Sequence, residues 1–318
     1  MQRDMHTRRD RPDRMSAFAA AVGQVSGVEN SVSIEPGLLY VVATPIGNLD
    51  DMSPRAVRVL QQVNWIAAEN TIYSKRLLQR FGVDTPIVSY HDFNEDTRIP
   101  RIILDLQAGK SIALISDAGT PLISDPGFSL LRALSERNLR AVPIPGPSSV
   151  LAALSVSGLP TDRFAFEGFL PAKSAARRGR LASLRDDDRT LIFMEACHRI
   201  HASLFDMADL FGAQRSAVVA RELTKIYEEV RADTLSELCG WVAKMAPPKG
   251  EFVVLVHGAA REAGKSIQHD QEVRRLLGVL LEELPAARAV AVAVKLTNYK
   301  RNYLYGMAMA MKNGRESS

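Results

Sequence analysis

Three loops in the first half of the sequence have the residue types of a small-molecule binding site. They span 44–48, 116–121 and 145–149, are rich in Gly, Pro and small polar residues, and each follows an apolar run of strand length. Small residues let the backbone approach a ligand closely, and N–H groups at the start of a following helix can hold a carboxylate or a hydroxyl. An ordinary turn explains one such loop, but three loops behind three strands favour a ligand site.

Polar clusters also follow predicted strands, at 69–71, 91–95, 195–199 and 221–225. Each is expected at the carboxyl end of a strand, where ligands bind in α/β sheets. A lone histidine such as His91 is more often a hydrogen-bonded surface residue than a catalyst, and no pair of His or Cys has ligand spacing, so we predict no metal.

The sequence has no GxGxxG motif, and neither Gly-Lys-Ser triplet has the glycine spacing of a phosphate loop.

Basic residues gather in two places that suit an anionic partner. The first group is Lys173, Arg177, Arg178 and Arg180; the second is Lys295, Lys300, Arg301 and Lys312, with Tyr299, Tyr303 and Tyr305 interleaved. Cationic side chains beside aromatic rings suit a phosphate backbone and splayed bases. Solvated helix faces explain the same charges equally well.

The elements that must position these residues alternate between strand and helix. Strands are predicted at 38–43, 65–68, 86–90, 111–115 and 140–144, with helices at 54–63, 75–81, 99–107, 128–136 and from 149. A second set has strands at 164–166, 190–194, 217–220 and 252–257, and helices at 175–184, 200–211 and 234–245. The alternating βα units of the first set predict a parallel sheet covered by helices, and from about 268 onward the pattern is purely helical.

This organisation predicts an α/β protein with two α/β domains and a small helical tail. We expect the N-terminal α/β domain over 37–158, the C-terminal α/β domain over 159–262 and the tail domain over 268–312. Residues 1–36 read as a flexible basic extension.

Composition is that of a globular protein without a membrane span. The 318 residues are 46% hydrophobic and 24% charged, and no apolar run reaches the ~20 residues of a span. Cys197 and Cys239 have neither zinc nor redox spacing and predict reduced thiols in a cytoplasmic protein. The net charge of +4 and a pI near 9.1 lean mildly toward an anionic partner.

The loops resemble the signature motifs of a known family. The motifs are LYVVATPIGNL at 39–49, SDAGTPLISDPG at 116–127, FEGFLP at 166–171, ARELTK at 220–225 and KGE at 249–251. They are similar to those of the bacterial 16S rRNA (cytidine-2'-O)-methyltransferases, relatives of the tetrapyrrole methylases. The resemblance covers about residues 37–312.

The resemblance implies a fold of the tetrapyrrole methylase type, with S-adenosylmethionine held in a cleft between the two α/β domains. It implies that the 2'-hydroxyl of a cytidine in the decoding region of 16S rRNA, or of the small ribosomal subunit, receives the methyl group, and that the enzyme works as a homodimer. By motif position, the cofactor contacts are Pro45, Ser116, Asp117, Ala118, Gly119, Thr120, Pro121, Ser148, Ser149, Phe193, Met194, Glu222 and Gly250.

A ribose hydroxyl is a weak nucleophile, so a base or a cation that stabilises the developing alkoxide should help. Glu222, Asp117 and Glu95 are the candidate acid–base groups, and Lys225 and Arg221 are the candidates for holding phosphate or alkoxide. The predicted RNA-binding residues are Lys173, Arg177, Arg178, Arg180, Arg199, Arg221, Lys300 and Arg301.

The chain departs from the family at one motif. The family usually reads Ala-Glu-Asp-Thr-Arg after its second strand, and this chain has Asn70 and Ile72 at the acid and arginine positions. Replacing both members of a charge pair avoids leaving one charge unpaired, which argues against simple damage. If those two groups bind RNA or position the hydroxyl, their replacement weakens the enzyme or alters its substrate.

Two other functions remain open at this point. One is methylation of a tetrapyrrole by the same fold, which the basic linker and the Lys- and Tyr-rich tail disfavour. The other is a catalytically weakened protein that binds ribosomal RNA during assembly. Strong salt dependence of binding distinguishes RNA from a small ring.

Overall fold

The computed structural model describes residues 34–245, 247–260, 263–297, 299 and 301–315. These residues divide into two compact units: one holds two β-sheets with their helices, and the other holds three helices after residue 257 together with residues 186–188. Within the described part of the chain, no helix is both long and apolar enough to cross a membrane.

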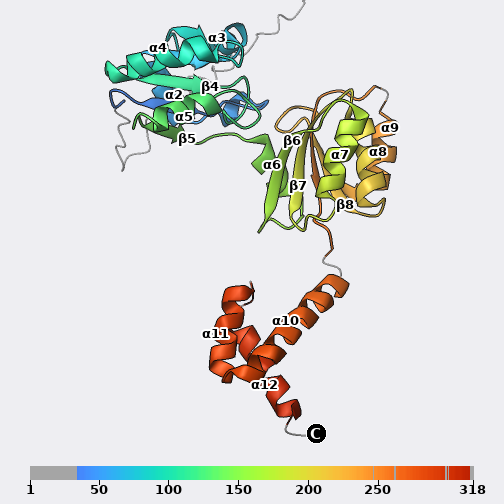
Figure 1. Cartoon of the computed structure of the whole chain (residues 1–318). Coiled ribbons are helices and arrows are strands. Elements are labelled where there is room, and N and C mark those ends of the chain that lie inside the picture. The colour runs from blue at the N-terminus through green and yellow to red at the C-terminus, as the bar shows by residue number, and fades with distance from the viewer. Residues whose placement is uncertain (1–33, 246, 261–262, 298, 300, 316–318) are drawn as a thin grey trace, which may run out of the picture. The chain divides into compact units, whose positions relative to one another are not determined.

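The N-terminal sheet is parallel throughout and has the strand order β3-β2-β4-β1-β5 (Figure 1). Its strands are β1 (Leu39–Val42), β2 (Trp65–Ala68), β3 (Ile87–Ser89), β4 (Ile112–Ile115) and β5 (Ala141–Ile144). The connecting helices are η1 (Leu49–Asp51), α2 (Pro54–Gln62), α3 (Thr71–Gln79), α4 (Glu95–Gln107), α5 (Phe128–Ser135) and α6 (Ser149–Val156).

Successive side chains along the buried strands point to opposite faces of the sheet, so the core of this domain consists of two layers. Tyr40 and Val42 of β1 pack with α2 and α3, whereas Leu39 packs on the opposite face with α4 and α5. Side chains that alternate between two covered faces give strands that are apolar at nearly every position. This is why β1 and β4 read as continuous apolar runs.

The C-terminal sheet is mixed, with the order β6-β7-β10-β8-β9. Only β6 and β7 are parallel; β10 runs antiparallel to both β7 and β8, and β9 runs antiparallel to β8. Its elements are β6 (Phe164–Phe169), α7 (Ser174–Leu184), β7 (Thr190–Ala196), α8 (Ile200–Phe211), β8 (Ser216–Arg221), β9 (Glu229–Thr234), α9 (Leu235–Ala243) and β10 (Glu251–Val256).

Helices cover both faces of this second sheet as well. The larger core cluster packs β7, β8 and β10 against α7, α8 and α9. The opposite face packs Ile192, Val218 and Leu255 against Val150 and Leu154 of α6. Helix α6 follows the last strand of the first sheet, so it joins the two sheets within one unit.

The tail is a three-helix unit: α10 (Ala263–Glu283), α11 (Ala286–Leu296) and α12 (Arg301–Arg315). It has its own core, in which Leu277, Val290, Ala293 and Leu304 are fully buried.

Several sequence expectations need correction. Strand β9 was not predicted, because its polar sequence EVRADT lacks an apolar run. It lies at the edge of the sheet, where its side chains are mostly exposed or half-buried. Helix α4 begins at Glu95 rather than at 99 and holds Pro100 in its interior, and α3 begins at Thr71 rather than at 75. The parallel sheet expected of the first set of strands is confirmed, whereas the second sheet, for which no strand direction was predicted, is mixed.

The predicted extension over 1–36 lies mostly outside the described residues. Its last residues belong to the N-terminal domain, because Ile34 packs against the core and the Glu35 N–H donates to the Tyr40 hydroxyl at 3.0 Å. The Glu35 carboxylate also pairs with Arg140 at 3.3 Å.

Candidate active site

The three glycine- and proline-rich loops interlock at the carboxyl edge of the N-terminal sheet. Thr44 and Gly119 exchange backbone hydrogen bonds of 2.9 and 3.0 Å, and the Thr120 hydroxyl donates to the Pro147 carbonyl at 3.0 Å. Gly119 has φ of +81°, and a Cβ there would lie 3.3 Å from Ile46. A glycine is therefore needed where the loops approach each other.

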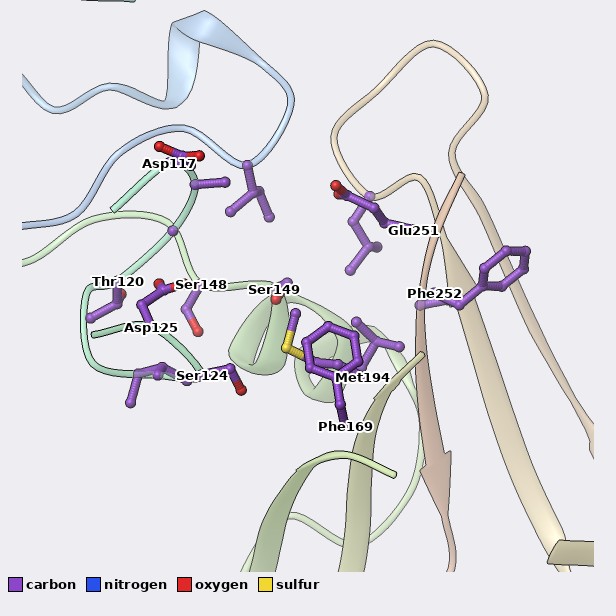
Figure 2. A pocket seen from close by; sticks show the side chains of 17 residues that line it. Asp117, Thr120, Ser124, Asp125, Ser148, Ser149, Phe169, Met194, Glu251 and Phe252 are labelled. Carbon is purple, nitrogen blue, oxygen red and sulfur yellow. The ribbon is translucent and has the colours of Figure 1, made fainter. Parts of the chain in front are cut away.

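These loops form one side of a pocket of about 230 Å³, and the C-terminal sheet forms the other (Figure 2). The volume lies slightly below the ~300 Å³ lower end of typical small-molecule sites. The lining residues are Ile46, Asp117, Ala118, Gly119, Thr120, Ile123, Ser124, Asp125, Ser148, Ser149, Phe169, Met194, Ala220, Leu223, Glu251, Phe252 and Val253.

The charged side chains of the pocket lining are all acidic. Asp117, Asp125 and Glu251 contribute carboxylates, and among the residues that the structure describes no Lys, Arg or His lines the pocket. Apolar side chains such as Phe169 and Met194 face them across the space (Figure 2). Such a pocket attracts a cationic ligand with an apolar or aromatic portion and disfavours a phosphorylated cofactor.

Burial makes two of these acids unusually basic. It raises the pKa of Asp125 to about 6, and the neighbouring Glu69 and Asp117 carboxylates add to the shift while a hydrogen bond from Ser116 opposes it. Burial also raises the pKa of Asp117, although its carboxylate accepts a hydrogen bond from the Asn70 N–H at 3.2 Å. Raised pKa values in a cleft are typical of functional carboxyls.

Glu69 extends this acidic group at the end of β2. Burial raises its pKa, and the nearby Asp117 and Asp92 carboxylates raise it further. Negative charge is therefore concentrated at the carboxyl edge of the N-terminal sheet. The ion pairs described in this domain involve other acids, such as Asp105 and Glu35, and not Glu69, Asp117 or Asp125.

Asn70, which stands where the family resemblance leads us to expect an acid, caps helix α3. Its side-chain oxygen accepts from the N–H groups of Ile72 and Tyr73 at 3.2 and 3.1 Å and so caps α3. Asn and Asp are almost equivalent as N-caps, so the exchange preserves the turn. Ile72 is 69% exposed and does not line the pocket.

Glu222 is held in an ion pair beside the pocket. The Lys225 ammonium contacts Glu222 at 2.8 Å and Glu251 at 3.0 Å, and the Glu251 N–H donates to Glu222 at 3.0 Å. Burial alone opposes ionisation of Glu222, but the bonds from Lys225 and Glu251 outweigh it, so the pKa of Glu222 is lowered. A carboxylate stabilised in this way is a poor base, and neither Glu222 nor Lys225 lines the pocket.

The loop that carries this ion pair is conformationally constrained. Glu222 and Thr224 have φ of +50° and +67°, values that residues with a side chain seldom adopt. Gly250 has φ of +98°, and a Cβ there would lie 2.5 Å from Glu222. A Cβ at Gly47 would overlap the Lys225 side chain, so the loop also lies against the first binding loop.

Glu95, the third predicted acid–base group, is hydrogen-bonded to a residue outside the pocket. The Tyr90 hydroxyl donates to its carboxylate at 2.6 Å, and burial together with this bond raises the pKa of Tyr90. Glu95 does not line the pocket.

The predicted cofactor residues divide into two sets. Asp117, Ala118, Gly119, Thr120, Ser148, Ser149 and Met194 line the pocket; Pro45, Ser116, Pro121, Phe193, Glu222 and Gly250 adjoin it but do not. Phe193 is fully buried in the core of the C-terminal domain, because it precedes Met194 in β7 and alternate strand residues face opposite sides.

Sequence reasoning overlooked Asp125, Phe169 and Glu251 as site residues. The first two lie inside motifs that carried the family resemblance, and Glu251 ends the KGE motif. Membership of such a motif was the available signal for all three residues, and charge was a second signal for Asp125 and Glu251. Among the described residues, no group of three or more His, Cys, Asp or Glu is placed to hold a metal ion.

Most of the predicted RNA-binding arginines are engaged within the protein. Arg177 corrects the prediction most clearly, because it is only 6% exposed and its guanidinium pairs with buried Asp206 at 2.7 Å. Arg178 pairs with Asp206 and Asp209, Arg180 with Glu167, Arg199 with Glu195, and Arg221 with the Lys249 carbonyl and Glu229. Lys173 and Arg301 are exposed, and Lys300 lies outside the described residues.

Comparison with known families places the chain. The model of the Tetrapyrrole (Corrin/Porphyrin) Methylases matches residues 38–239, and that of the RsmI C-terminal HTH domain matches residues 268–312. Ribosomal RNA small subunit methyltransferase I of Pseudomonas aeruginosa is 53% identical over 275 residues, covering 86% of this chain and 97% of the relative. Its counterpart in Escherichia coli O157:H7 is 45% identical over 276 residues, covering 86% and 95%.

Solved structures agree on the fold. A cobalt precorrin-4 methyltransferase superposes with a TM-score of 0.52 at 14% identity, covering 70% of this chain and 95% of its own. The methyltransferase CobJ superposes with a TM-score of 0.53 at 19% identity, again covering 70% and 95%. At these identities the likeness supports the fold alone and confirms the predicted fold class.

Members of this family use S-adenosylmethionine, as the sequence predicted. The family match spans most of the chain, and the relatives are aligned over nearly their whole length. The chain belongs to the tetrapyrrole methylase family, and within it to the ribosomal RNA small subunit methyltransferase I group.

Proposed function

We propose that this protein transfers the methyl group of S-adenosylmethionine to the 2'-hydroxyl of a cytidine in the decoding region of 16S rRNA. The structural observation that carries the proposal is a pocket charged only by carboxylates, at the carboxyl edge of a parallel sheet. High identity to ribosomal RNA small subunit methyltransferases supports the RNA substrate.

The residues present suit the cofactor. S-adenosylmethionine has a sulfonium and an ammonium cation, which Asp117 and Asp125 attract; the third lining carboxylate, Glu251, is already paired with Lys225. Its carboxylate suits the hydroxyls of Ser148 and Ser149 at the N-terminus of α6, where backbone N–H groups favour negative charge. Phe169, Met194 and Leu223 provide apolar surface for the adenine ring.

The bound cofactor supplies an electrophilic methyl group on sulfur. The protein's part is to position the ribose hydroxyl, exclude water and accept the proton. Among the lining carboxyls, Asp125 is best suited to the proton, because its pKa of about 6 keeps it ionised at neutral pH yet more basic than an exposed carboxylate. Asp117 is held in place by the Asn70 N–H and is the second candidate.

This assignment revises the acid–base roles inferred from sequence. Asp117 is retained, whereas Glu222 and Lys225 become an ion pair that holds the neighbouring loop. A substrate in the small ribosomal subunit implies action in the cytoplasm. The homodimer implied by the family resemblance stays a prediction.

The test uses labelled S-adenosylmethionine and small ribosomal subunits from cells that lack this gene, followed by nucleoside analysis of the RNA. Label on the 2'-oxygen of a cytidine is the expected result, and subunits from cells with the gene should accept little label because the position is already methylated. Label on a base, on another nucleoside, or no transfer at all would overturn the proposal.

A further inference from the structure

The tail unit contains a groove between α10 and α12 that the methyltransferase chemistry does not use. Its volume is about 580 Å³, which lies within the ~300–1,000 Å³ range of ligand pockets. Arg274, Asn302 and Tyr303 provide polar groups, and Gly306, Met307 and Met311 are among the residues that form its apolar part.

The composition of the groove suits a nucleotide. Tyr303 is 48% exposed and stacks on Tyr299 with ring centroids 5.3 Å apart and planes 19° apart, so a flat aromatic platform is already assembled. Asn302 is exposed and its amide can pair with a base edge, while exposed Arg274 can contact phosphate. Polarisable methionine side chains adapt to a flat ring.

The charge around the groove favours a polyanion over a peptide. Arg274 is the charged residue among the described lining residues, and residues 301–311 of α12 include Arg301 and no acid. On α10, exposed Arg275 adjoins Arg274 and exposed Glu272 lies two residues before it, so the cations outnumber the acids. A groove with cationic and aromatic groups is the arrangement that binds single-stranded nucleic acid.

Gly306 gives the groove room. It lies within α12 and lines the groove, and a Cβ built on it meets nothing within 4 Å. Glycine inside a helix lowers its stability by roughly 1 kcal/mol relative to alanine, so its presence here is not explained by the helix. The missing side chain instead leaves space beside Tyr303.

We propose that the groove between α10 and α12 binds an unpaired base of the RNA substrate, with Tyr303 as the stacking surface, Asn302 at the base edge and Arg274 at the phosphate. This inference rests on the proposed ribosomal RNA substrate, because it assigns a second contact to that RNA. The tail then contributes to substrate recognition, and the pocket between the two sheets contributes the reaction.

The test fills the groove without removing any contact. In the full-length protein, Gly306→Met should occupy the space beside Tyr303 and should not lower the thermal midpoint, because methionine is a better helix former than glycine. Binding of a short labelled single-stranded oligoribonucleotide should weaken about tenfold, the scale of one lost base stack. Gly240→Ala in α9, where a Cβ also meets nothing within 4 Å, is the matched control and should leave binding unchanged.

Two further probes separate the contacts. Tyr303→Phe should retain most of the affinity for RNA, because stacking needs the ring rather than the hydroxyl. Tyr303→Leu, which removes the ring, should weaken RNA binding about as much as Gly306→Met does. An oligomer of the same length with abasic sugars should bind wild type and Gly306→Met equally, since it offers phosphates and no base. Arg274→Ala should reduce the salt dependence of binding more than Arg288→Ala, which removes an exposed arginine of α11 outside the groove.

The outcomes also separate this inference from the proposed function. Unchanged RNA affinity in Gly306→Met overturns the groove assignment, and a change of oligomeric state without a change in RNA affinity identifies the groove as an interface between copies. Either result leaves methyl transfer by the wild type standing. Failure of the wild type to methylate ribosomal RNA, with weakened oligonucleotide binding by Gly306→Met, overturns the reaction and supports the groove.

Discussion

The carboxylates of the two sheets have different surroundings. At the edge of the parallel N-terminal sheet, Asp117 and Asp125 have raised pKa values and no cation of the pocket lining beside them. In the mixed C-terminal sheet, Glu195 pairs with Arg199 and Glu222 with Lys225. Acids with opposing cations stabilise local structure, whereas acids left without them at a cleft are available for chemistry.

The largest expected effect is on turnover. Asp125→Asn keeps the shape of the side chain but removes the proton acceptor, so single-turnover methyl transfer at saturating cofactor should fall about 10²- to 10⁴-fold. Asp162→Asn, at an exposed carboxyl outside the pocket, is the matched control. A rate for Asp125→Asn within twofold or so of wild type would remove Asp125 from the acid–base role and leave Asp117.

The next largest effect is on stability and concerns the ion-paired acids of the C-terminal domain. Arg177→Ala leaves Asp206 buried without one of its two arginines, which should lower the free energy of unfolding by about 3–5 kcal/mol. Arg132→Ala breaks the exposed pair with Glu136 and should change it by at most about 0.5 kcal/mol. Urea unfolding measures both; weaker RNA binding by Arg177→Ala with unchanged stability would restore its predicted role in RNA binding.

The raised pKa of Asp125 predicts a stability effect opposite in sign to that of Arg177. Folding raises this pKa from its usual value near 4 to about 6, so the charge destabilises the fold fully above pH ~6 and less as the pH falls toward ~4. Asp125→Asn should therefore raise the thermal midpoint at about pH 7.5 and raise it less at about pH 4.5. An increase that is equal at both pH values would indicate a packing effect rather than a charge effect.

The smallest effect concerns the helix cap next to these acids. Asn70→Ala removes the cap of α3 and should lower the free energy of unfolding by about 1 kcal/mol, whereas Asn70→Asp should retain it. Chemical denaturation of the two variants tests the interpretation of the family departure. Equal losses in both would show that the amide group, rather than a capping oxygen, is needed at this position.

The sequence predicted the binding loops better than the roles of charged residues. Continuous apolar runs at β1 and β4 located the loops that follow them, and seven of the thirteen predicted cofactor residues line the pocket. The hydrogen bond from the Glu251 N–H to Glu222 depends on antiparallel β8 and β10, which bring residues 29 positions apart into contact. The burial of Arg177 depends in the same way on α8 packing beside α7, which places Asp206 against it.

The pH dependence of single-turnover methyl transfer tests the central claim most directly, with wild type, Asp125→Asn and Glu222→Gln compared on small ribosomal subunits. We expect the wild-type rate to rise through pH ~6 and then level off, Asp125→Asn to lose this rise, and Glu222→Gln to keep it even if its rate is lower. A rise that persists in Asp125→Asn and disappears in Glu222→Gln would contradict the account, because the paired carboxylate would then be the base.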